Sequence, residues 1–138
     1  MIKNIRHTGI VVRDLNKSYN FYTELGFKTK SDEIESGEFL EFILGIKNCS
    51  IRIIKMVCNE QMIELLKYQT PKSNDAKKLV NSIGCSHIAM TVKNIEVLYK
   101  KLSNLGVNFI NPPLSNGVVK VAFCKDPNDV YLELVEEL

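Results

Sequence analysis

One stretch occurs twice in this chain, and the duplication constrains the fold more than any other feature of its 138 residues. A shift of 80 positions places the nine residues that begin at His7 over the nine that begin at His87. The match continues without a gap to Gly26, which lies over Gly106. Because a unit that recurs in register predicts a repeated architecture, the two histidines of the chain should occupy equivalent places.

Each copy carries the signals of a strand followed by a helix. Residues 5–12 and 86–92 are rich in β-branched residues, which favours strands. Asp14 and Asn94 then precede apolar residues at helical spacing, so both are predicted N-caps. The paired glycines follow as C-terminal stops. Each copy therefore predicts a strand, a capped helix and a turn.

The rest of each half reads mainly as strands. Further strands are predicted over 27–34, 38–44, 50–57, 61–68, 107–110, 118–124 and 130–136, and a short helix over 76–83. Each half is then a βαβββ module, and the first has 11 more residues, placed between Lys28 and Val57. We therefore predict an α+β fold of two βαβββ modules in a pseudo-twofold arrangement. One domain spans 1–138, with module one at 1–68, a linker at 69–83 and module two at 84–138.

Composition excludes several classes of function. Apolar residues make up 45% and charged residues 25% of the chain, which is typical of soluble globular proteins. The net charge of +2 comes from dispersed lysines, so neither nucleic acid nor a membrane is an expected partner. The N-terminus shows no signal-peptide pattern, and a cytoplasmic location is expected. The four cysteines lack metal-knuckle spacing and are expected to be reduced thiols that pack as small hydrophobes.

Two carboxylates sit in the middle of otherwise apolar strands. Glu64 lies in M-I-E-L-L and Glu133 lies in Y-L-E-L-V, at corresponding places near the end of each module. An unpaired buried charge costs several kcal/mol, so each carboxylate needs a basic partner, a metal or a raised pKa. A lone glutamate in a strand usually points to water, which is the simpler reading for either one alone.

The two histidines raise the same question. Gly9 and Ala89 lie two residues beyond them on the same strand faces, and such small residues leave room for a ligand or solvent. A single strand histidine is more often a hydrogen-bonded core residue. Two histidines and two glutamates in twofold register favour a shared metal site, because the alternative needs the same coincidence in both halves. Nitrogen and oxygen donors of this kind suit a divalent first-row metal.

The sequence resembles the vicinal oxygen chelate superfamily, which includes glyoxalase I, methylmalonyl-CoA epimerase, extradiol dioxygenases and the bleomycin- and fosfomycin-resistance proteins. The resemblance covers essentially the whole chain. It rests on H-T-G-I-V-V-R-D-L, Y-N-F-Y-T-E-L-G-F, S-H-I-A-M-T-V and V-A-F-C-K-D-P-N-D-V-Y-L-E-L-V-E-E. It implies the glyoxalase/bleomycin resistance/dioxygenase fold. It also implies one divalent ion per site, whether Ni, Zn, Co, Mn or Mg, held by His7, Glu64, His87 and Glu133.

A four-ligand set narrows the chemistry that the resemblance implies. Redox oxygenases leave metal positions open for dioxygen, and the drug-sequestering members typically lack the metal residues. We therefore expect a metal-dependent lyase or isomerase of the glyoxalase I type, similar to lactoylglutathione lyase. It would move a proton next to a metal-bound carbonyl through an enediolate, on a small molecule with adjacent oxygens. Glu64 and Glu133 are the candidate catalytic bases, and Glu133 is preferred.

Other readings stay open. The chain could be an isomerase like methylmalonyl-CoA epimerase, or a small-molecule binding or resistance protein without turnover. In glutathione-dependent glyoxalases an arginine and an asparagine help to hold the tripeptide, and this chain has Val11 and Tyr68 at those places. An acyl-CoA, another small α-oxygenated acid or a thiol adduct is therefore comparably expected. Tyr68, Phe42 and Phe123 are candidates to line the cavity. A homodimer is expected by resemblance only.

Overall fold

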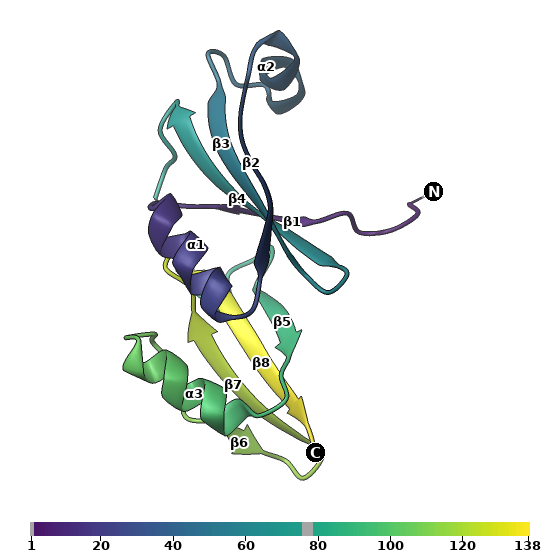
Figure 1. The fold of residues 1–138 in the computed structure, drawn as a ribbon, viewed down its shortest axis with the longest axis vertical. Coiled ribbons are helices and arrows are strands. Elements are labelled where there is room, and N and C mark those ends of the chain that lie inside the picture. The colour runs from purple at the N-terminus through teal and green to yellow at the C-terminus, as the bar shows by residue number, and fades with distance from the viewer. Residues whose placement is uncertain (1, 76–78) are drawn as a thin grey trace. The chain divides into compact units, whose positions relative to one another are not determined.

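The chain folds into two compact units, Met1–Asp75 and Ala76–Leu138, each built around one four-stranded sheet (Figure 1). The structure is a computed structural model, and it describes residues 2–75 and 79–138. Two four-stranded sheets with three helices among the described residues confirm the predicted α+β class and the glyoxalase/bleomycin resistance/dioxygenase fold.

Unit one follows the first copy of the repeat. Its elements are β1 (Thr8–Val11), α1 (Leu15–Glu24), β2 (Lys28–Ser36), α2 (Glu38–Leu44), β3 (Ser50–Cys58) and β4 (Gln61–Thr70). The strand order is β1-β4-β3-β2, in which β1 runs parallel to β4 and the other neighbours are antiparallel.

Unit two repeats this topology without a counterpart of α2. Its elements are β5 (His87–Thr91), α3 (Ile95–Asn104), β6 (Leu114–Ser115), β7 (Val119–Lys125) and β8 (Tyr131–Glu137). The strand order is β5-β8-β7-β6, again with one parallel pair, β5 and β8. The first strand of each module therefore lies beside its last strand, which brings the histidine segment next to the glutamate segment.

The register of these parallel pairs is the same in both units. Gly9 lies opposite Glu64 in unit one, and Ala89 lies opposite Glu133 in unit two. Because successive side chains alternate between sheet faces, each histidine, two residues earlier, is on the face of its glutamate. The sequence repeat is thus also a repeat of strand register.

Local signals set the helix ends. The side chains of Asp14 and Asn94 each accept a hydrogen bond of 3.0 Å from the backbone N–H three residues on, as predicted for N-caps. The helices stop at Gly26 and Gly106, whose φ angles of 96° and 81° lie in the region that glycine adopts without strain. Both helices therefore begin and end where the sequence predicted.

The core of each unit lies between sheet and helix. In unit one the buried side chains include Ile10, Tyr22, Met56, Ile63 and Leu65, and in unit two they include Ile95, Leu102, Ala122, Leu132 and Leu134. A second cluster in unit one joins Leu40 of α2 to Cys49, Ile51 and Ile53, with Leu66 packed against it. Because the pleat of β4 places Leu66 on the face of Glu64, this second cluster lies on the same sheet face as the glutamate.

The predicted strand over 38–44 was wrong, because these residues form helix α2. The segment runs E-F-L-E-F-I-L, without the alternation of a half-buried strand, and it lies between two glycines. Gly45 takes the left-handed conformation, φ 67°, that ends the helix. Leu40 turns into the second cluster, so the surplus residues of the first half add a helix over one end of β2 and β3 (Figure 1).

Three other boundaries differ from expectation. The first strand begins at Thr8 rather than residue 5. Residues 107–110 contribute one isolated bridge, between Phe109 and Cys124, rather than a strand. The predicted helix over 76–83 falls partly outside the described residues, and 80–83 form turns and bends instead. No helix in the described ranges has the length and apolar character needed to cross a bilayer.

Candidate metal centre

In unit one, His7 directly precedes β1 and lies beside Glu64 of β4. Nε2 of His7 lies 3.4 Å from Oε2 of Glu64, and the two side chains are 33% and 11% exposed. The glutamate is one of three buried polar or charged residues among the described part of the chain, and the histidine lies within ion-pair distance of it. Small Gly9 faces Glu64 across the strands, and a Cβ there would come within 3.2 Å of Leu66 Cδ1.

In unit two, β5 and β8 repeat the arrangement with His87 and Glu133. Nε2 of His87 lies 3.1 Å from Oε2 of Glu133, with side chains 36% and 25% exposed. Both predicted histidines therefore meet the predicted glutamate of their own half through the same ring nitrogen. Each pair is reachable from solvent, as a metal or substrate site requires.

The atom separations in both pairs fit two ligands of a single ion. Donors that each lie about 2.1 Å from one metal, at an angle of about 90–110°, are about 3.0–3.4 Å apart. The observed separations are 3.4 Å and 3.1 Å. A direct ion pair between carboxylate and imidazolium has similar spacing, so the geometry is compatible with either state. The imidazole and carboxylate donors themselves suit a divalent first-row metal.

Each half brings together two side chains that could bind a metal. Among the described residues no group of three or more His, Cys, Asp or Glu side chains suited to a metal ion occurs. Two donors per unit are fewer than the four protein ligands of a closed site. That His7, Glu64, His87 and Glu133 serve one ion therefore stays a prediction.

The two pairs differ in their neighbour on the next strand. Lys55 lies opposite Glu64 in the β3–β4 register, whereas Phe123 lies opposite Glu133 in the β7–β8 register. The Phe123 ring meets the His87 ring edge-on, with centroids 5.3 Å apart. One glutamate thus has a cationic neighbour and the other an aromatic one.

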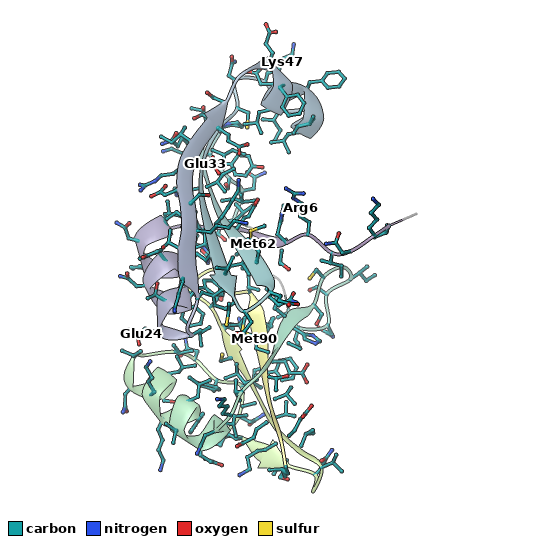
Figure 2. All side chains as sticks on the ribbon, turned by 45° about the vertical axis from the view of Figure 1, so that its right-hand side comes forward. Arg6, Glu24, Glu33, Lys47, Met62 and Met90 are labelled. Carbon is teal, nitrogen blue, oxygen red and sulfur yellow. The ribbon has the colours of Figure 1, made fainter. Side chains whose placement is uncertain are left out.

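Lys55 is held toward the edge strand by an acidic partner. Its Nζ lies 2.6 Å from Oε1 of Glu33, which is labelled on β2 in Figure 2. The hydrogen bond from Lys55 lowers the pKa of Glu33, and the same bond is the main cause of the raised pKa of Lys55. Glu64 adds a smaller Coulombic contribution to that rise. Lys55 is therefore a permanent cation on the face of the first pair.

Sequence reasoning missed one polar contact at this centre. Oγ of Ser86 lies 3.1 Å from Nδ1 of His87, and the signal for it is a hydroxyl residue directly before the histidine. Of the aromatic residues predicted to line a cavity, Phe42 is 87% exposed on α2. Tyr68 packs against the second cluster of unit one.

The cysteines take no part in either pair. All four are free thiols, and Cys49 and Cys124 are buried as expected of small hydrophobes. Burial is the main cause that raises the pKa of Cys124 to about 12. Cys85 is exposed rather than packed.

Comparison with known proteins places these features in a family. Residues 4–134 match the model of the Glyoxalase/Bleomycin resistance protein/Dioxygenase superfamily. A lactoylglutathione lyase of Schizosaccharomyces pombe is 34% identical over 96% of this chain, which spans 47% of that protein. A probable lactoylglutathione lyase of Synechocystis is 30% identical over 94% of this chain and 92% of its own length.

Solved structures share the fold at lower identity. A glyoxalase family protein from Bacillus cereus has a TM-score of 0.92 and 21% identity, with 100% of this chain and 96% of that chain covered. The fosfomycin resistance protein FosX of Listeria monocytogenes, solved with Mn(II) and sulfate, has a TM-score of 0.65 and 16% identity. Its match covers 100% of this chain and 95% of that chain.

Proposed function

Because the chain belongs to the Glyoxalase/Bleomycin resistance protein/Dioxygenase superfamily, also called the vicinal oxygen chelate superfamily, we propose that it is a metal-dependent lyase or isomerase of the glyoxalase I type. The observation that carries the proposal is the recurrence of one His–Glu pair in both units, with matching atoms and matching strand register. The names of several relatives, lactoylglutathione lyase, support the same reaction class.

His7, Glu64, His87 and Glu133 are the residues that would hold the divalent ion. The donor chemistry and the separations of 3.4 Å and 3.1 Å support this assignment. The fold itself accommodates such an ion, since FosX was solved with Mn(II). When bound, a divalent cation supplies Lewis-acid polarisation of a substrate carbonyl. The family's substrates are small molecules, and in this chain we propose one with two adjacent oxygens.

Glu133 is the proposed base. Its carboxylate takes the proton from the carbon next to the carbonyl, leaving the electron pair in an enediolate, and returns a proton to the neighbouring carbon. Its side chain is 25% exposed and is flanked by Phe123, so a substrate can approach it. Glu64, at 11% exposure, lies beside the cation Lys55 and is better placed to remain a fixed ligand. By family likeness we also propose that the chain acts as a homodimer.

Two other functions use the same residues. An isomerase like methylmalonyl-CoA epimerase needs the same proton transfer. Val11 and Tyr68 stand where glutathione-dependent glyoxalases have the arginine and asparagine that hold glutathione, which favours a substrate that is not a glutathione adduct. A binding or resistance protein would hold a small molecule at the same residues without turnover. We keep the lyase as the first proposal because several relatives are named lactoylglutathione lyase.

The test is a metal analysis followed by a turnover screen. The purified protein is first assayed for bound divalent metal, and a content below about one-tenth of a site per chain would favour the binding protein. The metal-loaded protein is then given methylglyoxal with a series of thiols, and separately methylmalonyl-CoA, with spectrophotometric detection. We expect turnover of at least one hemithioacetal that ceases on chelation. Turnover of methylmalonyl-CoA alone would assign the epimerase, and none with any substrate would remove the enzyme proposal.

A further inference from the structure

Ser86 stands between the second histidine and the turn that precedes β5. Its Oγ lies 3.1 Å from Nδ1 of His87 and 2.8 Å from the carbonyl oxygen of Val80, to which it donates. That carbonyl belongs to a turn in which the N–H of Ser82 donates to the carbonyl of Leu79 at 3.0 Å. The N–H of Leu79 in turn donates to Oγ of Ser82, also at 3.0 Å. The acceptor of the Ser86 proton therefore lies inside a turn that two hydrogen bonds between Leu79 and Ser82 close.

This arrangement decides which nitrogen of His87 carries a proton. A serine hydroxyl has one proton, and here it points to Val80, so toward the ring the oxygen can only accept. Nδ1 of His87 must then be the N–H donor, and in the neutral ring the lone pair lies on Nε2. Nε2 is the atom that faces Glu133. In that neutral state Nε2 and the carboxylate are both acceptors, so the 3.1 Å gap between them suits a cation, whereas a doubly protonated ring would donate from Nε2 to Glu133 instead.

We propose that Ser86 is a positioning residue that holds His87 as an Nε2 metal ligand. The inference rests on the proposed function, because it assumes that His87 binds the ion. Without the hydroxyl, the ring is free to adopt the other tautomer, in which Nε2–H donates to Glu133 and the metal-binding nitrogen is blocked. The first half lacks this device, since the residue before His7 is Arg6.

Two variants of the same shape isolate the hydroxyl. Ser86→Thr keeps the Oγ, whereas Ser86→Val replaces it with a methyl group, and both are β-branched, so a packing defect would affect both. Zinc affinity is measured by calorimetry on the full chain. We expect Ser86→Val to bind zinc about 10–100-fold more weakly than wild type and Ser86→Thr to stay close to it. Equal affinities for the valine and threonine variants would overturn the proposal.

A second readout does not depend on affinity. The chain has two histidines, so the ring N–H signals of the zinc-loaded protein are few and can be assigned by NMR. We expect Nδ1–H of His87 to exchange with water faster in Ser86→Val than in Ser86→Thr, with His7 unchanged as the internal control. Unchanged exchange at His87 would contradict the assignment. If wild type binds neither zinc nor any of nickel, cobalt, manganese and magnesium, the proposed function fails as well, whereas metal binding that is indifferent to residue 86 removes Ser86 alone.

Discussion

The assignment of two different roles to Glu64 and Glu133 is made at the scale of single residues. The same pair of residue types was copied by the duplication, but the neighbouring strand gives one glutamate Lys55 and the other Phe123. Chemically identical groups take different roles when their surroundings differ. The sequence repeat predicts the pairs, while the difference between them depends on cross-strand register, which the repeat alone does not show.

Replacing the proposed base should separate catalysis from metal binding. We expect Glu133→Gln to lower kcat by about 10²–10⁴-fold, because an amide cannot take the proton. The variant should still bind metal, since three ligands and an amide oxygen remain. Glu137→Gln, a change of the same kind near the end of β8, is the control and should leave kcat unchanged. Turnover by Glu133→Gln at the wild-type rate would remove Glu133 from the mechanism.

The cysteines offer a residue-scale test of the core. Because burial raises the pKa of Cys124 to about 12, the reactive thiolate is about 10⁻⁴ of that group at pH 8, and it grows only as the pH approaches that value. Iodoacetamide at pH 8 should therefore modify exposed Cys85 first and leave Cys124 intact. Labelling is read by mass spectrometry, with the denatured chain as the control in which all four react. Modification of Cys124 as fast as Cys85 would place it outside the core.

At the scale of elements, local signals predicted some segments and tertiary contacts decided others. The ends of α1 and α3 follow from Asp14, Asn94 and two glycines, which act within a few residues. Helix α2 also depends on the packing of Leu40 against a cluster of side chains from β3 and β4. Its own sequence does not show that this contact forms. Residues 107–110 failed to form a strand although the N–H of Ile110 donates to Phe123 at 2.9 Å, because the prolines that follow cannot continue the ladder.

We expect only the buried face of helix α2, which carries Leu40, to contribute to the stability of the fold. Leu40→Ala empties a buried position in the second cluster, and we expect it to lower the free energy of unfolding by about 2–5 kcal/mol. Phe42→Ala in the same helix removes a side chain that is 87% exposed and should change that free energy by less than about 0.5 kcal/mol. Urea denaturation followed by circular dichroism compares the two. A larger loss for Phe42→Ala would mean that the outer face of α2 is packed in solution.

At the scale of the whole molecule, the duplication is the feature that the sequence reports best. It predicted two βαβββ modules with one histidine and one glutamate in each, and the structure adds their strand order and the contact of each histidine with the glutamate of its own half. It did not predict the contacts of Ser86 with His87 and Val80, because the residue at the matching place in the first copy is Arg6. Repetition thus predicts what the halves share, and the structure is needed for what distinguishes them.

The most direct test of one ion held by both pairs is the metal stoichiometry of wild type and of two paired variants. Inductively coupled plasma mass spectrometry measures metal per chain in wild type, His7→Ala/Glu64→Ala and His87→Ala/Glu133→Ala. If both pairs serve one ion, wild type holds one metal per chain, and removal of either pair abolishes tight binding. Two metals per chain, or one metal retained after a pair is removed, would show that the pairs act separately and would contradict the shared centre.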